Sequence, residues 1–181
     1  VRRAIIVQTL VMAMLFSVLT MIHPIYDVTY DKNDSFPFWF ALVAVFSGAA
    51  SLLNAAIVVG LGMQAVITWT MCLQVTISAL ILLVMWTDSA AYFWLFLLWQ
   101  FVLFCQASLV IGNLNALAME PMGHIAGTAA SVVGAIATVF AALIASPIGL
   151  LFDGTPRPLL IAIIALTIPS VVVMLRIGRA S

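Results

Sequence analysis

Charged residues are scarce in this sequence. Asp, Glu, Lys and Arg together make up 7% of the 181 residues, whereas hydrophobic residues make up 66%. A soluble domain carries about 25% charged residues, so this composition excludes an ordinary soluble domain and predicts an integral membrane protein, with the lipid bilayer as its surroundings. Basic and acidic residues balance at six each, without a basic block, and the sequence therefore predicts no nucleic-acid partner.

Residues that build catalytic centres are equally scarce. The two cysteines, Cys72 and Cys105, lie within apolar runs, which predicts small core residues rather than a disulfide or a metal pair. The sequence contains neither a His-Glu-x-x-His motif nor a Gly-x-Ser-x-Gly motif, and no pair of aspartates lies within an apolar run. We therefore expect no enzyme activity, no metal site and no cofactor.

Six apolar segments are long enough to cross a bilayer, which takes about 20 helical residues. The breaks between them contain Gly, Pro, Asn, Asp or Ser, the residues typical of turns. The sequence therefore predicts an all-α polytopic membrane protein, a single bundle of six transmembrane helices over residues 1–181. The predicted spans are approximately 4–25, 36–59, 63–86, 90–118, 125–151 and 158–176.

The positions of the charged residues support six spans and indicate an orientation. All twelve lie in a break or at a chain end, as expected because a charge at the centre of a membrane helix costs about 2.5–3.5 kcal/mol on insertion scales. Four arginines lie at the chain ends, whereas only Lys32 and Arg157 lie in the loops of the other side. By the positive-inside rule both termini are then cytoplasmic. His23 and His124 fall on opposite sides of the membrane, which excludes a shared metal or haem.

Polar side chains inside the fourth predicted span are candidate functional residues, because a polar group in hydrocarbon faces a partner helix or a cavity. Gln106 and Asn113 lie seven residues apart on one face of this helix, and Gln100 lies on another. Each could bond to a neighbouring helix, for about 0.6 kcal/mol on average, or could line a substrate cavity. We single out all three as cavity candidates because an amide is costly to leave unpaired.

The end of the first span holds two more cavity candidates, His23 and Tyr26. Thr9, Thr20 and His23 project to one side of this helix, within about 60° of each other. His23 has two interpretations, a proton-coupling group or an interfacial residue beside the aromatic anchor Tyr26. No span contains a central carboxylate, so His23 is the candidate for a proton site.

The fifth span is rich in small residues at helical spacing. Ala126, Ala130 and Gly134 follow i, i+4, i+8, and Gly127 and Ser131 lie beside them. Small residues let helix backbones approach closely in lipid, where packing rather than the hydrophobic effect drives association. The pattern therefore predicts that this face of the helix packs tightly against its neighbours.

The segment GNLNALAMEPMGHIAGTAASVVGAI (112–136) is similar to the junction between spans 10 and 11 of major facilitator superfamily drug/proton antiporters, specifically the bacterial Bcr/CflA drug-resistance branch. SVLTMIHPIYDVTY (17–30) resembles the family's seventh span and outer loop. SLLNAAIVVGLGMQAVI (51–67) resembles its span 8 to 9 junction, and ASPIGLLFDG (145–154) the end of its eleventh span. The residues that match the family pattern at the span 10 to 11 junction are Asn113, Ala116, Leu117, Ala118, Pro121, Gly123, Ala126, Gly127, Thr128, Ala129 and Gly134.

This resemblance implies a fold and a function. Transporters of the family have two six-span halves, each built of 3+3 inverted repeats around a midplane site, and this chain resembles the second half. A proton-coupled multidrug efflux antiporter of the inner (plasma) membrane is implied, which exports small lipophilic substrates by alternating access with the proton as coupling ion. The first, second, fourth and fifth helices would line the central cavity. The family's coupling carboxylates belong mostly to the first half, which would explain why none is present here.

The resemblance also implies a partner that completes the transporter. We expect the chain to be the C-terminal half of a longer protein, in agreement with its start at Val1 without Met. The alternatives are a self-sufficient half-transporter that pairs with a second copy, and a non-transporting scaffold subunit. Asn54 and Gly62 match the family's cytoplasmic loop between spans 8 and 9, but Gly60 and Gln64 stand where that loop generally carries basic residues.

Overall fold

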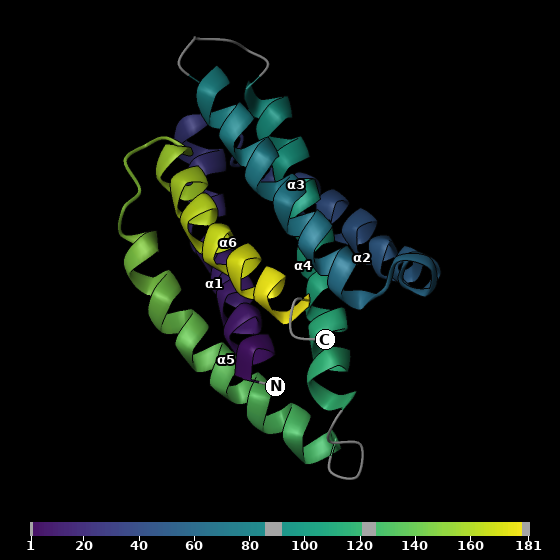
Figure 1. Ribbon diagram of the computed structural model, residues 1–181. Coiled ribbons are helices and arrows are strands. Elements are labelled where there is room, and N and C mark those ends of the chain that lie inside the picture. Colours follow the sequence, from purple (N-terminus) through teal and green to yellow (C-terminus); the bar gives the residue numbers. More distant parts are fainter. Residues whose placement is uncertain (1, 86–91, 121–125, 179–181) are drawn as a thin grey trace.

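The computed structural model describes residues 2–85, 92–120 and 126–178 (Figure 1). Within these ranges the chain is all-helical, without a β-strand, so the prediction of an all-α fold is confirmed. The helix bounds lie within a few residues of the predicted spans. The elements are α1 (Arg2–Pro24), the π-helix η1 (Ile25–Thr29), α2 (Phe36–Leu61), α3 (Met63–Val84), α4 (Tyr92–Met119), α5 (Ala126–Gly149) and α6 (Arg157–Gly178).

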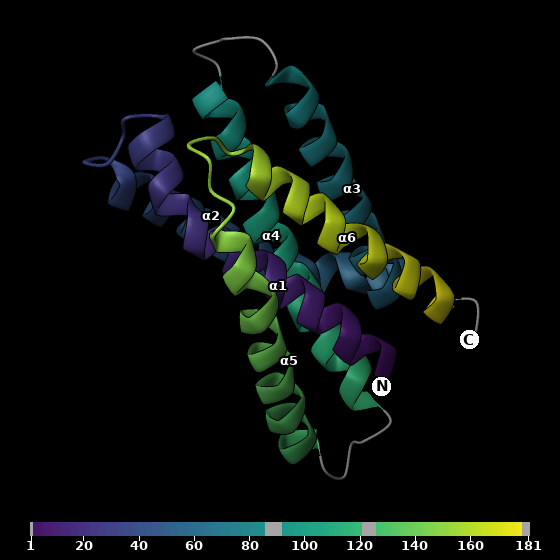
Figure 2. The same ribbon diagram turned by 90° about the vertical axis from the view of Figure 1, so that its left-hand side faces the viewer.

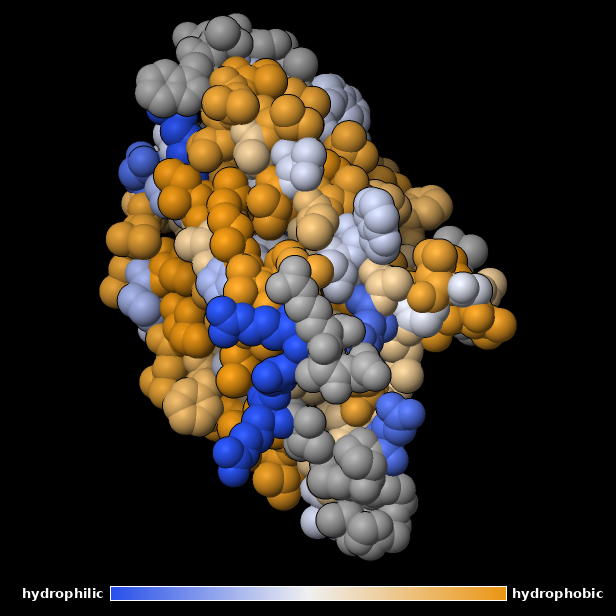
Figure 3. Space-filling view, viewed as in Figure 1, coloured by the Kyte–Doolittle hydropathy of each residue, from blue (hydrophilic) through white to orange (hydrophobic). Residues whose placement is uncertain are grey.

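Most of these helices have the length and composition of membrane spans. In the described part of the chain, α1 with η1, α3, α4, α5 and α6 are each long and apolar enough to cross a bilayer, and α2 contributes a shorter apolar stretch, Phe36–Leu52. Large apolar side chains such as Val59, which is 89% exposed, lie on the surface, and Figure 3 shows that the face in view is mostly hydrophobic. Such a surface suits lipid rather than water. The protein therefore has the character of a multi-pass membrane protein, while the cytoplasmic orientation of its termini stays a prediction.

Two local features set the helix boundaries near α1, α2 and α3. Gly62 alone separates α2 from α3, with a φ of +81° that favours glycine. The Gly62 N–H donates to the carbonyl of Val58 over 2.8 Å and closes α2 before α3 begins. α1 ends at Pro24, but helical structure continues beyond it through the five residues of the π-helix η1.

Helices α1 and α4 form the centre of the bundle (Figures 1 and 2). α1 packs against α4, α5 and α6, α4 packs against α1, α2 and α3, and α3 packs against α6. α1 and α4 are antiparallel, because Gln8 near the start of α1 bonds to Asn115 near the end of α4, and Tyr26 of η1 bonds to Gln100 near the start of α4. α2 and α5 lie outside this centre, mainly against α4 and α1 respectively.

The apolar core lies along α1 and α4. Both helices bury an apolar stripe whose members are three, four or seven residues apart, spacings that keep side chains on one helix face. Because every face of these helices is largely apolar, burial rather than composition distinguishes the core. The stripe consists of Val7, Val11, Met14, Val18 and Met21 on α1 and of Phe96, Leu103, Val110 and Leu114 on α4.

Charged residues gather at the two ends of the bundle. The terminal end carries the start of α1 and the end of α6, and there the Arg3 guanidinium donates to the carbonyl of Arg176 over 2.7 Å. The opposite end carries the loop 150–156, and there the Arg157 guanidinium donates to the carbonyl of Met85 over 2.8 Å. A cation at the last carbonyls of a helix is favourable because it complements the helix dipole.

The two cysteines differ in burial. Both cysteines are free; Cys105 is partly buried, but Cys72 is exposed on α3. The prediction of a core position was therefore wrong for Cys72, since a helix that faces lipid exposes apolar side chains. His124 lies outside the described residues. The described ranges contain no group of three or more His, Cys, Asp or Glu that could hold a metal ion.

Candidate functional site

Tyr26 and Gln100 form a buried polar pair at the end of the bundle that carries the loop 150–156. The Tyr26 hydroxyl donates to the amide oxygen Oε1 of Gln100 over 2.8 Å, which joins η1 to α4. Both side chains are fully buried. The sequence predicted both as cavity residues, and the structure brings them into direct contact.

Aromatic rings surround the Tyr26 phenol. The rings of Phe36, Phe93 and Phe96 lie edge-on to it, with centroid distances of 5.2, 5.7 and 6.2 Å, an arrangement favoured by the charge distribution of aromatic rings. The ammonium of Lys32 lies 5.0 Å from the centre of the Phe93 ring, within the range of a cation–π interaction. The bond from Tyr26 to α4 is therefore enclosed by apolar groups, where a hydrogen bond is stronger than in water.

The π-helix η1 positions this cluster. It begins directly after Pro24 and carries Tyr26, and the Thr29 hydroxyl at its end donates to the carbonyl of Gly154 over 2.8 Å. π-helical turns are rare and occur frequently at functional sites. Burial raises the pKa of the Tyr30 phenol just beyond η1, with the Tyr26 phenol adding to the effect.

His23 lies beside this cluster but is exposed. Its ring packs edge-on against Phe36, with a centroid distance of 5.1 Å. Phe36 thus contacts both His23 and Tyr26, and the two candidates predicted on the first span are near neighbours. Of the two, only His23 presents its side chain at the surface.

A second polar cluster joins α3 to α4. The Trp99 indole N–H donates to the Ser78 hydroxyl over 2.8 Å, and the amide nitrogen of Gln74 lies 3.4 Å from the same oxygen. Gln106 is buried two turns further along the same side of α4. The Trp99–Ser78 bond joins the two helices, whereas the Gln74–Ser78 contact lies within α3.

Two amide pairs hold α4 nearer the terminal end. Asn113 donates to Asn54 Oδ1 over 2.9 Å and accepts from the Asn54 amide nitrogen over 3.2 Å, so the pair is reciprocal and links α4 to α2. On α1, the Gln8 amide nitrogen donates to Asn115 Oδ1 over 2.9 Å. The sequence predicted Asn54 as part of a loop motif and Asn113 as a cavity residue, but it did not predict a role for Gln8 or Asn115. Each of these two could have been recognised as a polar residue within an otherwise apolar run.

Some buried amide groups keep an unused hydrogen-bonding atom. An unpaired polar atom in a protein interior costs about 1–3 kcal/mol, so each is a place where a water molecule or a polar ligand group would bind favourably. The atoms without a partner in the described part of the chain are Gln8 Oε1, Gln74 Oε1, Gln100 Nε2 and Gln106 Nε2.

Burial separates the five predicted cavity residues into two groups. Tyr26 and Gln100 are 0% exposed, Gln106 is 3% exposed and Asn113 is 4% exposed, whereas His23 is exposed. A side chain buried among the six helices does not contact a molecule bound at the outer surface of the bundle. Four of the five candidates therefore act within the bundle, and His23 alone lies at its exterior.

The small residues singled out on the fifth span are not on the face of α5 that packs within this chain. Gly127 and Ser131 are exposed, Ala130 and Gly134 are partly buried, and the side chain of Ala126 lies outside the described part. Apart from the backbone of α5 and the adjacent residues, no described atom lies within 4 Å of the position of a Cβ added at Gly127 or Gly134. Tight packing occurs on a neighbouring face instead, since spacing alone does not reveal which face meets a partner. The buried residues of that face are Val133, Ala137, Ala141 and Ala145.

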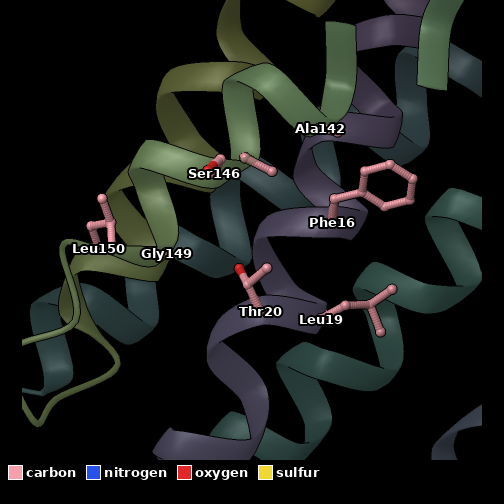
Figure 4. A pocket seen from close by; sticks show the side chains of 8 residues that line it. Phe16, Leu19, Thr20, Ala142, Ser146, Gly149 and Leu150 are labelled. Carbon is pink, nitrogen blue, oxygen red and sulfur yellow. The ribbon is translucent and has the colours of Figure 1, made fainter. Parts of the chain in front are cut away.

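A surface groove runs between α1 and α5 near the opposite end, and we call it the α1/α5 groove (Figure 4). Its volume is about 500 Å³. Close approach of the helices forms its floor, because a Cβ at Gly149 would lie 3.2 Å from the Thr20 hydroxyl oxygen. The hydroxyls of Thr20 and Ser146 are its polar groups. The lining residues are Phe16, Leu19, Thr20, Ala142, Ala145, Ser146, Gly149 and Leu150.

A groove between α2 and α4 differs in its lining, and we call it the α2/α4 groove. Its volume is about 310 Å³, and its lining surface is almost wholly apolar. Of the two, only the α1/α5 groove offers hydrogen bonds to a bound molecule. The residues of the α2/α4 groove are Leu42, Val43, Phe46, Trp94, Leu97, Leu98 and Phe101.

In comparisons with known proteins, no protein-family model and no curated protein matches the sequence, and no solved structure matches the fold. The resemblance to major facilitator antiporters therefore stays a prediction that depends on the sequence motifs.

Proposed function

We propose that the chain is the C-terminal six-helix half of a proton-coupled efflux antiporter of the major facilitator type, which exports small lipophilic molecules by alternating access. The groove between α1 and α5 is the part of this half that contacts the substrate. The coupling carboxylate belongs to the half that completes the transporter, because the described spans carry no carboxylate away from their ends; Asp27 lies in η1, at the end of the first span.

The pairing of the helices is the observation that carries the proposal. Suppose that α1, α2 and α3 are equivalent to α4, α5 and α6 in that order. The contact of α1 with α5 then corresponds to that of α4 with α2, and the contact of α1 with α6 to that of α4 with α3. The contacts α1/α4 and α3/α6 correspond to themselves. All of these pairs are in contact. Two structurally equivalent units of three helices each produce this pattern.

The helix directions support the same division. α1 and α4 are antiparallel, and α3 and α6 are antiparallel because Arg157 at the start of α6 bonds to Met85 at the end of α3. α1 and α5 are parallel, since Met12 meets Thr138 and Thr20 meets Gly149. An inverted repeat requires equivalent helices to run in opposite directions, which α1 and α4 do.

The α1/α5 groove has the properties of a site for a small lipophilic molecule. Small-molecule pockets measure about 300–1,000 Å³ and combine apolar walls with a few polar groups, and this groove has about 500 Å³ and two hydroxyls. His23 lies three residues beyond Thr20 on the same side of α1. A titratable group therefore lies next to the proposed substrate surface.

A transport assay with two matched variants tests the proposal. The protein purified from its native membrane would be placed in liposomes under an imposed proton gradient, and accumulation of ethidium would be followed by fluorescence. Ala142→Phe fills the α1/α5 groove, whereas Ala165→Phe adds the same ring to an exposed position of α6. We expect Ala142→Phe to lower uptake about tenfold, which corresponds to about 1.4 kcal/mol, and Ala165→Phe to retain it.

Two outcomes would overturn the proposal. Absence of gradient-driven uptake would favour a scaffold role, and equal uptake by both variants would remove the groove from the transport path. Intact mass and size in detergent distinguish the remaining alternative, because a self-sufficient half-transporter would be a dimer of chains near 19.4 kDa.

A further inference from the structure

A third groove lies between α3 and α6 at the terminal end, away from the proposed transport surface, and we call it the α3/α6 groove. Its volume is about 510 Å³. The indole of Trp69, which is 72% exposed, lies at this groove, and tryptophan prefers the boundary between lipid tails and headgroups. The lining residues are Gln64, Ala65, Thr68, Trp69, Cys72, Met174 and Leu175.

Arginines cluster next to this groove. Leu175 lines the groove and Arg176 follows it directly. The Arg3 guanidinium contacts the Arg176 carbonyl over 2.7 Å, which places Arg2 and Arg3 at the same corner of the bundle. All three arginine side chains are exposed, and Figure 3 shows hydrophilic side chains gathered amid the apolar surface near the ends of α1 and α6. In the described part of the chain no carboxylate pairs with them.

We propose that the α3/α6 groove binds an anionic phospholipid. One acyl chain lies along the groove, and the phosphate is held by Arg176 and Arg3, with Arg2 beside them. Guanidinium groups recognise phosphate through paired, charge-assisted hydrogen bonds. Among the described residues Arg3 uses one of its N–H groups, for the Arg176 carbonyl, and the lipid phosphate would accept from the others.

Arginines lie beside the α3/α6 groove, although none of the three grooves described has a charged residue in its lining. The headgroup is therefore placed at the arginines next to the groove, and only the acyl chain lies within it. Basic pockets between helices, on the side of the membrane where the arginines lie, suit anionic headgroups. This proposal is independent of the transport function, because it uses neither the α1/α5 groove nor a completing half.

Native mass spectrometry of the intact protein tests the proposal. The protein would be equilibrated in detergent with equal amounts of dioleoyl phosphatidylglycerol and dioleoyl phosphatidylcholine, which share acyl chains and differ in headgroup charge, and the retained lipids counted. Each arginine near a charged lipid contributes about fivefold in affinity. We expect the wild type to retain mainly phosphatidylglycerol, and Arg3→Gln with Arg176→Gln to lose at least about tenfold of this preference.

Matched variants separate the headgroup contacts from the groove. Lys32→Gln removes one positive charge at the opposite end and is expected to leave the preference intact. Thr68→Trp fills the groove, whereas Thr76→Trp changes an exposed position of the same helix. We expect Thr68→Trp to reduce retention of both lipids and Thr76→Trp to leave it unchanged.

Clear outcomes would overturn the proposal. Equal retention of both lipids by the wild type would exclude an anionic-lipid site, and a preference that survives loss of both arginines would exclude them as the phosphate contacts. Full retention by Thr68→Trp would exclude the groove as the acyl site. Helix content by circular dichroism identifies any variant that does not fold. Arg176→Gln alone then replaces the double variant and is expected to lose about fivefold of the preference; an unchanged preference would exclude Arg176 as a phosphate contact.

Discussion

The two parallel helix pairs, α1/α5 and α2/α4, are held together by different kinds of side chain. α1 and α5 approach through Ala137, Ala141, Ala145 and Gly149, with hydroxyl groups at the surface of the contact. α2 and α4 pack through aromatic rings, with the Phe40 and Phe104 rings 5.8 Å apart. An amide pair adds hydrogen bonds between α2 and α4.

The difference between the two contacts decides which helix pair can bind a partly polar molecule. Lipid tails give helices no hydrophobic reason to associate, so close backbone contact and interhelical hydrogen bonds must hold them together. The alanine-based contact of α1 and α5 leaves a groove with two hydroxyls accessible, whereas the aromatic contact of α2 and α4 leaves only apolar lining. The pair held by small residues is therefore the one able to bind a partly polar molecule.

The largest expected effect comes from a matched glycine pair. A Cβ at Gly149 of α5 would lie 3.2 Å from Thr20 Oγ1, while a Cβ at Gly48 of α2 meets nothing within 4 Å. We expect Gly149→Leu to lower the free energy of unfolding by about 2–3 kcal/mol through overpacking, and Gly48→Leu to leave it within about 0.5 kcal/mol. Unfolding in sodium dodecyl sulfate, followed by circular dichroism, measures both. Equal effects would show that the two contacts do not differ in closeness.

The amide pair of α2 and α4 gives the next largest effect. Asn113→Leu removes one partner and leaves the Asn54 amide unpaired, which we expect to cost about 1–2 kcal/mol. Replacing both residues by leucine removes the unpaired group as well, so the double variant should be more stable than Asn113→Leu alone. A double-mutant cycle in the same unfolding assay measures the coupling, expected at about 0.6–1.7 kcal/mol. A coupling near zero would mean that the pair contributes nothing to helix association.

The smallest effect concerns the aromatic contacts. Phe36 on α2 lies edge-on to both His23 and Tyr26, whereas Phe140 on α5 is 54% exposed. We expect Phe36→Leu to lower the free energy of unfolding by about 1 kcal/mol, because aromatic pairs contribute about 0.5–1.5 kcal/mol beyond their buried area. Phe140→Leu should have almost no effect. A larger loss for Phe140→Leu than for Phe36→Leu would contradict the view that α1/α5 depends on small residues.

The helices could be predicted closely because their signals are local. Apolar length identifies a span, and residues such as Gly62 and Pro156 mark its limits. η1 was not predicted, since Pro24 normally ends or kinks a helix, and continuation as a π-helix depends on contacts such as that of Thr29 with Gly154.

The candidate site was predicted only in its residue types. Gln100, Gln106 and Asn113 were recognised as polar groups that need partners, but their burial was not. Gln8 and Asn115 were missed, although each is the other's partner. In a chain that is apolar on almost every face, hydropathy does not distinguish the side that meets a neighbouring helix from the side that meets lipid.

The sequence by itself determined the all-helical class, the six apolar segments and the placement of charges at the bundle ends, because each follows from the cost of polar groups in hydrocarbon. Only the tertiary structure decided that Tyr26 meets Gln100, that α5 packs through its alanine face and that arginines from both ends of the chain meet beside one groove. These contacts join residues far apart in the sequence. They depend on which helices pair, and in lipid that choice follows from shape and hydrogen bonding between whole helix faces.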